Sequence, residues 1–247
     1  MNFIKSFIVF RMKGTKMNVN NRGYSSMMAE GFMSKVYGWM CAGLGVTASA
    51  SYYLLEVNPQ LMRSLTSNWF AVLGLMLVSI GIIMYMSINA ARLSYATMAV
   101  MFLTFCALEG VVLAPVLAFY TSASVFYVFL IAAAMFATMA LYGWMTNADL
   151  SSMGNILLMG MIGIFIASLI NMFVQSSGFS MIISCFGVGI FAMLTAYDVQ
   201  NLKKYSQSVM ASPEDAGKFA LMGALSLFLN LINIFMYLLQ LFGDRRK

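Results

Sequence analysis

Two acidic residues, Glu109 and Asp198, lie inside long apolar stretches of this sequence, and they are its first candidates for chemistry. A charged side chain in the middle of a bilayer costs roughly 2.5–3.5 kcal/mol or more, so such residues usually face a protein interior and have a function. Asp198 stands in the segment AYDVQNLKK, and Arg92 follows another apolar stretch in SINAARLSY. An ion pair with Arg92 would favour the charged form of Asp198, and burial would favour the neutral form. Asp198 is therefore a candidate proton-controlled latch.

Each of these residues also has a plainer interpretation. Asp198 could snorkel at the membrane interface, and Arg92 could be an ordinary basic residue of a cytoplasmic loop. Glu109 could serve an ion or proton path, or it could be a protonated side chain that hydrogen-bonds to a neighbouring helix. Gly110 follows Glu109 directly and Pro115 lies six residues further on, a pair that could loosen the helix.

The last apolar stretch carries polar residues at helical spacing: Ser226, Asn230, Asn233, Tyr237 and Gln240. Steps of 4, 3, 4 and 3 place all five on one face of a helix. Amides that faced lipid would lack partners, so we expect this face to look into protein or water and this helix to be central. The face could be a hydrophilic path, or it could join helices through hydrogen bonds worth about 0.6 kcal/mol each.

Other residues of the apolar stretches are expected to serve packing alone. A shorter polar set in the fifth stretch is interpreted as interhelical hydrogen bonding: Ser168, Asn171 and Gln175. Pairs of small residues would let helices approach closely: Gly38 and Ala42, Gly160 and Gly163, Gly187 and Gly189. The three cysteines are far apart in sequence and are interpreted as small core residues: Cys41, Cys106 and Cys185.

The composition places these residues in a membrane protein. Of the 247 residues, 62% are hydrophobic and only 9% are charged, against roughly 45–50% and about 25% in soluble domains. The net charge of +6 does not indicate nucleic-acid binding, because most charges stand between apolar runs and would orient the chain in a bilayer. The absence of His excludes imidazole-based catalysis and His-ligated zinc. No apolar span contains a Lys for a retinal Schiff base, and an intramembrane aspartic protease would need a second Asp, so we expect neither an enzyme nor a bound cofactor.

Seven continuously apolar segments are long enough to cross a bilayer, which predicts an all-α membrane protein. They are residues 36–55, 69–88, 95–119, 123–145, 154–174, 179–200 and 219–241. The predicted organisation is a basic cytoplasmic N-terminal segment (1–35), a seven-helix transmembrane domain (36–243) and a short tail (244–247). The longest connection is 201–218, and no connection is long enough for a second domain.

The distribution of Lys and Arg predicts a cytoplasmic N-terminus. Ten basic residues would then lie inside: Lys5, Arg11, Lys13, Lys16, Arg22, Lys35, Arg92, Lys203, Lys204 and Lys218. Four would lie outside: Arg63, Arg245, Arg246 and Lys247. The basic tail GDRRK argues mildly against an outside C-terminus, so an even number of spans stays open. The expected location is a bacterial inner membrane; a eukaryotic internal membrane is the alternative.

The first 16 residues, MNFIKSFIVFRMKGTK, are basic, and their longest apolar run is too short for a signal peptide. Their apolar residues could form one face of a short helix on the membrane surface. Alternatively, translation starts at Met17 and this stretch is not part of the protein.

Together, several segments resemble the Bax inhibitor-1 family, also called the transmembrane Bax inhibitor motif family, and its bacterial members in particular. These segments are RLS after the second span, ALEG and AP in the third, AYDVQNLKK closing the sixth, and the last span ALSLFLNLINIFMYLLQLFG. The resemblance covers residues 25–243 and is most specific in the last span. It implies six helices around a central seventh and a pH-sensitive calcium leak. Lipid, calcium and protons are then the expected partners.

In the bacterial members of that family, a pair of Asp residues on the last two helices shares a proton near the cytoplasmic mouth, and an Arg from the second span binds the pair in one state. Asp198 matches the first Asp and Arg92 matches the Arg, but the second Asp falls at Asn230. Two facing carboxylates titrate as a coupled pair, whereas one Asp beside an Asn does not. We therefore expect weaker or shifted pH control, with Glu109 as one candidate for the missing carboxylate.

Asp198 and Asn230 could contact calcium only weakly, because a tight site takes 6–8 oxygen ligands. With Arg92, Glu109 and Asn233 they make up the predicted gating and ion-path residues. An alternative function is that of a membrane-embedded regulator that binds a membrane-bound ATP-dependent protease, as some bacterial relatives do, without transport. Deletion of residues 1–24 should abolish such a role and leave ion flux intact.

Overall fold

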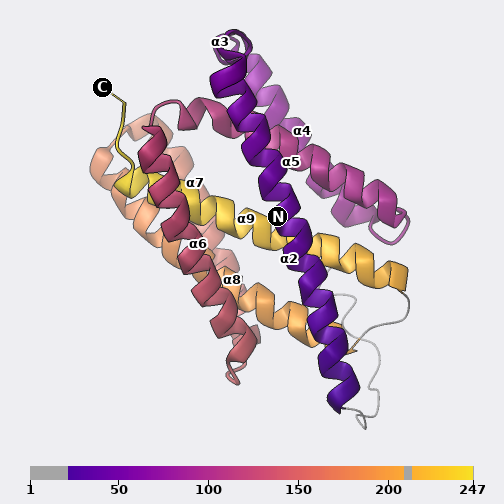
Figure 1. Ribbon diagram of the computed structural model, residues 1–247. Helices are drawn as coiled ribbons and strands as arrows, with labels where there is room; N and C mark the ends of the chain where they lie inside the picture. Colours follow the sequence, from indigo (N-terminus) through magenta and orange to yellow (C-terminus); the bar gives the residue numbers. More distant parts are fainter. Residues whose placement is uncertain (1–21, 209–212, 247) are drawn as a thin grey trace. The chain divides into compact units, whose positions relative to one another are not determined.

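A computed structural model describes residues 22–208 and 213–246, and it is helical over nearly all of them. The elements follow one another in the order drawn in Figure 1. They are α2 (Arg22–Tyr52), a π-helix (Tyr53–Val57), α3 (Pro59–Ser67), α4 (Trp69–Asn89), α5 (Tyr95–Leu117), α6 (Ser122–Met145), a 3₁₀ turn (Leu150–Ser152), α7 (Met153–Val174), α8 (Ser177–Ser208) and α9 (Pro213–Phe242). Within this part of the chain the predicted all-α class is confirmed.

Six of the described helices are long and apolar enough to cross a membrane. These candidate spans are Phe70–Asn89, Tyr95–Leu117, Ser122–Met145, Leu150–Val174, Ser177–Ser206 and Asp215–Phe242. The six correspond to the second to seventh predicted spans. The first predicted span, 36–55, lies on α2 and the π-helix. It has the length but not the hydropathy of the others, because small and hydroxyl residues fill much of GLGVTASAS.

Several helices extend beyond the apolar segments that predicted them. α2 begins at Arg22, inside the predicted N-terminal segment, while the first 16 residues lie outside the described part of the chain. The predicted connection 201–218 is mostly helical, because α8 continues to Ser208 and α9 begins at Pro213. Helix ends are set by caps as well as by hydropathy: Asn58 accepts the amide of Leu61 and starts α3 with a proline at its first position.

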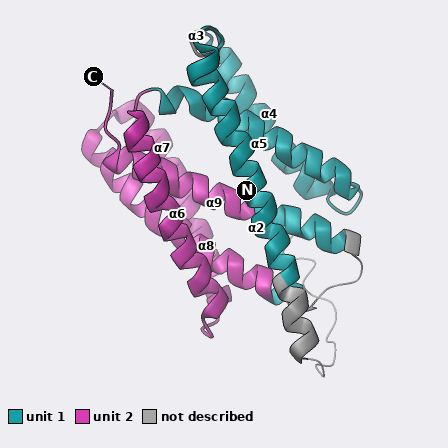
Figure 2. Cartoon of the chain, viewed as in Figure 1, with its two compact units in different colours: residues 1–118, 204–225 teal, residues 119–203, 226–247 magenta. Residues whose placement is uncertain are grey.

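The chain divides into two compact units, coloured in Figure 2. The first contains residues 1–118 and 204–225, and the second contains residues 119–203 and 226–247. α8 and α9 therefore each contribute residues to both units. Each unit is described below by itself.

In the first unit, α2 and α5 pack along a stripe of residues four apart. The indole Nε1 of Trp39 donates to the Tyr95 hydroxyl at 3.0 Å. One turn further along α2, Gly43 lies against Phe102. The next two turns bring two hydroxyls to α5: Thr47 Oγ1 donates to the Cys106 carbonyl and Ser51 Oγ donates to the Gly110 carbonyl, each at 2.8 Å. Residue numbers rise together on both helices, so α2 and α5 run in the same direction.

Glycines in the second unit bring α8 close to its neighbours. A Cβ on Gly143 of α6 would collide with the backbone of Ala196, and one on Gly154 of α7 would lie 2.6 Å from the Tyr197 hydroxyl. Nearer the start of α8, a Cβ on Gly187 would lie 2.6 Å from the Tyr237 ring. These three sites fix how closely α6, α7 and α9 approach α8.

The predicted packing roles of small residues are only partly right. Gly160 and Gly187 do lie against neighbouring side chains, but a Cβ on Gly38, Gly163 or Gly189 would meet nothing within 4 Å. Similarly, Cys106 is buried as predicted, whereas Cys41 and Cys185 are exposed. Both errors have one cause: in an apolar helix, hydropathy does not distinguish the face that contacts protein from the face that contacts lipid.

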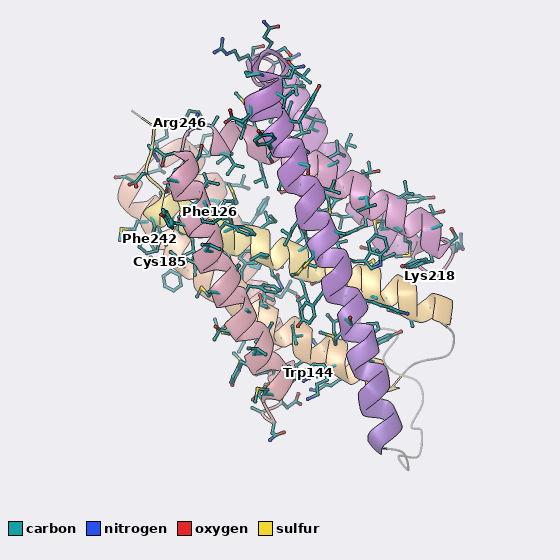
Figure 3. All side chains as sticks on the ribbon, viewed as in Figure 1. Phe126, Trp144, Cys185, Lys218, Phe242 and Arg246 are labelled. Atoms are coloured by element: carbon teal, nitrogen blue, oxygen red, sulfur yellow. The ribbon has the colours of Figure 1, made fainter. Side chains whose placement is uncertain are left out.

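The C-terminal tail is attached to the start of α6 within the second unit. The Thr121 amide donates to the Asp244 carbonyl at 3.0 Å, and the Arg246 amide donates to the Phe119 carbonyl at 2.9 Å. The Asp244 amide donates to Ser124 Oγ at 2.9 Å. The tail therefore holds the end of α9 against residues 119–124. Figure 3 labels Arg246 and Trp144, which mark opposite ends of α6.

Candidate functional site

The candidate site lies within the second unit, where the predicted latch residue Asp198 on α8 contacts Ser226 and Asn230 on α9. Oδ2 of Asp198 accepts two hydrogen bonds, from Ser226 Oγ at 2.7 Å and from Asn230 Nδ2 at 2.9 Å. Asn230 is 5% exposed and Asp198 is half-buried. The structure thus brings together two of the predicted site residues, Asp198 and Asn230.

Both donors meet a single oxygen of Asp198, and this determines what the site can do chemically. An ionised carboxylate oxygen can accept both bonds at once. A proton on the carboxyl group would remove its charge, and if it sits on Oδ2 the Ser226 hydroxyl must change from donor to acceptor. Protonation would therefore replace two charge-assisted bonds between α8 and α9 by weaker neutral ones.

The polar face of α9 follows α8 in the antiparallel direction. Tyr237 stacks on Phe191, with ring centroids 5.9 Å apart, and interacts with the side chain of Ser168 on α7. Further along α9, Gln240 accepts a bond from Ser184 Oγ at 2.6 Å and donates to Ser180 Oγ at 2.5 Å. The prediction that this face looks into protein is confirmed at these positions. Here the face holds helices together.

The other predicted member of this face, Asn233, behaves differently. Its Nδ2 donates to the Leu229 carbonyl of its own helix at 2.7 Å. In the fifth span, Asn171 likewise serves its own end of α7: its Oδ1 accepts the Ser176 amide, next to Gln175, which has left-handed backbone angles (φ 52°, ψ 33°). Asn171 therefore caps the end of its own helix, whereas Ser168 of the same predicted set does reach another helix, through Tyr237.

Arg92 and Glu109 belong to the first unit. Arg92 is exposed in the turn after α4, where its amide donates to the Asn89 carbonyl at 2.8 Å. Glu109 is half-buried in α5. The helix continues through Gly110 and Pro115 to Leu117. Gly110 instead leaves room for the Thr47 carbonyl. The Asp198–Arg92 pair and the role of Glu109 as a second carboxylate stay predictions.

Sequence reasoning missed two residues that follow Asp198 on α8. Gln200 is 5% exposed; its Nε2 donates to the Ala148 carbonyl at 2.7 Å, and its Oε1 accepts the Leu150 amide at 2.9 Å. Lys203 Nζ donates to the Trp144 carbonyl at 2.6 Å and lies 5.0 Å from the centre of the Trp144 ring. The sequence shows an amide, Gln200, two residues after the acidic Asp198 and three residues before Lys203, at the end of a predicted span.

In residues 22–208 and 213–246, no three His, Cys, Asp or Glu side chains gather in a way that would hold a metal ion. Asp198 and Asn230 provide a carboxylate and an amide, and calcium prefers oxygen ligands of this kind but takes more of them. Asp198 and Asn230 alone therefore provide too few ligands for a tightly bound calcium ion.

The helices and their packing define a multi-pass helical membrane protein. A family model described as inhibitor of apoptosis-promoting Bax1 matches residues 29–247. The chain belongs to this family, the Bax inhibitor-1 family.

Relatives match over most of their length. A protein of Borreliella burgdorferi is 39% identical over 216 residues, which are 87% of this chain and 93% of the relative. The inner membrane protein YbhL of Escherichia coli K12 is 36% identical over 87% of this chain and 92% of its own length. A protein of Rickettsia prowazekii is 34% identical over 87% and 90%.

Proposed function

We propose that this protein is a pH-sensitive calcium leak of a bacterial inner membrane, in which Asp198 is the proton-sensitive latch. The observation that carries the proposal is the pair of hydrogen bonds from Ser226 and Asn230 to one oxygen of Asp198. Inside a membrane domain, this contact joins two neighbouring helices through one ionisable group. The membrane assignment rests on the apolar helices and on YbhL, which is named an inner membrane protein.

The latch works through the geometry of that oxygen. With Asp198 ionised, both donors bind and α8 is held to α9. When the carboxyl group takes up a proton, the two charge-assisted bonds become weaker neutral ones and the two helices separate more easily at this end. The described contacts from α9 come from neutral side chains, so Asp198 supplies the titrating group of the contact. The side-chain carbonyl of Asn230 and the Asp198 oxygens would then offer weak, transient ligands to calcium.

The proposed architecture is seven transmembrane helices, six of them around α9. Support for a central α9 comes from burial: 72% of its apolar part is buried, against 11–50% in the other five candidate spans. Support for α2 as the seventh span comes from its partner. α2 runs parallel to α5, which is apolar enough to span, and hydrogen-bonds to it through Thr47 and Ser51. Hydroxyls that satisfy a neighbouring helix are typical of membrane interiors.

With seven spans, the excess of Lys and Arg supports a cytoplasmic N-terminus. Arg92 and the Asp198 end of α8 then lie on the cytoplasmic side. This orientation permits an Arg92–Asp198 contact in one state of the latch.

The proposal is tested by calcium flux into liposomes that contain the purified protein, measured from acid to neutral pH. We expect flux that depends on pH in the wild type and a flattened pH profile in Asp198→Asn, which keeps the shape of the side chain but cannot ionise. Ser184→Ala is the matched control, because it removes an α8–α9 hydrogen bond at the other end of the interface. Absence of flux from folded, inserted wild-type protein would overturn the proposal and favour the protease-regulator alternative.

A further inference from the structure

The α8 segment that carries Asp198 contacts two other parts of the second unit at the same time. Ala196, Gln200 and Lys203 are spaced by four and three residues, so they share one face of α8. That face meets the end of α6, through Gly143 and Trp144, and the turn that follows it. Asp198 lies two residues from both Ala196 and Gln200, about 200° around the helix, and it meets α9 instead.

Gln200 closes the α6–α7 turn, which we define as residues 146–149. A buried side-chain amide needs partners for its donor and its acceptor. Gln200 finds both on the backbone around this turn: its Nε2 donates to the Ala148 carbonyl, and its Oε1 accepts the Leu150 amide. Residues 147–149 of the turn are exposed, so this buried amide from another helix ties down a segment that borders solvent.

Lys203 makes a second attachment to the same region. The Trp144 carbonyl is among the last four of α6, and such carbonyls lack partners within their own helix. Lys203 Nζ donates a hydrogen bond to this carbonyl oxygen at 2.6 Å, and the positive charge of Lys203 complements the negative end of the α6 dipole. Its place 5.0 Å from the centre of the Trp144 ring adds a cation–π contact.

We propose that Gln200 and Lys203 are positioning residues that couple the Asp198 contact with α9 to the conformation of the α6–α7 turn. Because α8 is one continuous helix here, a shift of Asp198 relative to Ser226 and Asn230 displaces Gln200 and Lys203 as well. The turn is then the exposed element that responds to the state of Asp198. The proposed function supplies only the cause of the change at Asp198, which is its protonation. The coupling from Asp198 to the turn is inferred from the contacts of α8.

Hydrogen exchange of the Leu150 amide, measured on the protein in lipid nanodiscs, reports the coupling directly, because this amide donates to Gln200. Asp198→Asn does not touch the turn, yet we expect it to speed exchange at Leu150 several-fold. Gln200→Leu has a similar volume and removes both bonds to the turn. It should speed exchange at Leu150 at least about three- to tenfold, the effect expected for the bond of the Leu150 amide alone. In the Gln200→Leu background, Asp198→Asn should add no further effect.

Ser184→Ala is the control, because it weakens the α8–α9 interface far from the turn and should leave exchange at Leu150 unchanged. Lys203→Met removes the bond to the Trp144 carbonyl and should speed exchange at Leu150, whereas Lys203→Arg keeps a donor and should leave this exchange close to the wild-type rate. If Gln200→Leu fails to fold, the two Lys203 variants carry the same comparison. Unchanged exchange at Leu150 in Asp198→Asn would overturn the coupling. Calcium flux is measured in a separate experiment, so a failure of the coupling and a failure of the proposed calcium leak can be distinguished.

Discussion

Oδ2 of Asp198 accepts a hydrogen bond from Nδ2 of Asn230 at 2.9 Å, so the residue that the family resemblance matches to a second Asp is here a donor to the first. An amide donor satisfies the carboxylate without a shared proton. The helices can therefore stay joined while Asp198 is ionised. The two described donors to Asp198, Ser226 and Asn230, are neutral, so their bonds join α8 to α9 without a second carboxylate.

Asn230→Asp should convert the contact into a coupled pair. Two carboxylates at this separation cannot both ionise freely, so they should titrate in two steps separated by more than about one pH unit. We expect the pH profile of calcium flux in liposomes to become steeper or to gain a second transition.

Asn233→Asp is the matched control for that experiment. It places a carboxylate three residues further along α9, at a side chain that bonds only to its own helix through the Leu229 carbonyl among its described contacts. An equal change of the pH profile in both variants would show that any added charge on α9 suffices, and would contradict a specific role for the Asp198–Asn230 contact.

Glu109→Gln tests whether the second carboxylate is supplied from α5. The substitution keeps the size of a half-buried side chain and removes its ionisation. If Glu109 is coupled to Asp198, the pH profile of flux should shift and the Glu109→Gln, Asp198→Asn double variant should differ from the sum of the single ones. A pH profile identical to that of the wild type would rule Glu109 out.

The sequence was sufficient for the fold class and for the polar face of α9, because both follow from composition and from helical spacing. It also singled out Asp198, since an acidic residue in a span is rare enough to stand out. Gln200 was missed because a lone amide at the end of a span carries no periodicity, and its importance arises from a turn 50 residues earlier in the chain. The glycines were only half predicted, because spacing alone does not say which face of a helix meets protein.

Gly143→Ala should destabilise the second unit. Its Cβ would collide with the backbone of Ala196, which cannot move as a side chain could. Overpacking of this kind costs about 1–3 kcal/mol, and it should appear as a lower midpoint of thermal unfolding in detergent. Gly163→Ala is the control, because its Cβ would meet nothing within 4 Å. A midpoint as low in Gly163→Ala as in Gly143→Ala would contradict the close approach of α6 and α8.

Topology distinguishes seven spans from six. If α2 crosses the membrane beside α5, the N-terminus and the C-terminus lie on opposite sides. A fluorescent protein that folds only in the cytoplasm should then be bright at the N-terminus, and alkaline phosphatase, which is active only outside, should be active at the C-terminus. Two cytoplasmic ends would mean that the six apolar helices alone cross the membrane and that α2 lies elsewhere.

The C-terminal tail should stabilise the end of α9 that lies away from Asp198. Deletion of residues 244–247 removes the backbone bonds to Phe119 and Thr121, and Ser124→Ala removes the acceptor of the Asp244 amide. We expect the Ser124→Ala variant to lose about 0.5–1.5 kcal/mol, and the Thr121 amide to exchange faster in the deletion variant. Ser122→Ala is the milder control, because it loses only an exposed bond to the Arg246 side chain. Unchanged exchange at Thr121 in the deletion variant would mean that, in the membrane, the tail does not hold the end of α9 against residues 119–124.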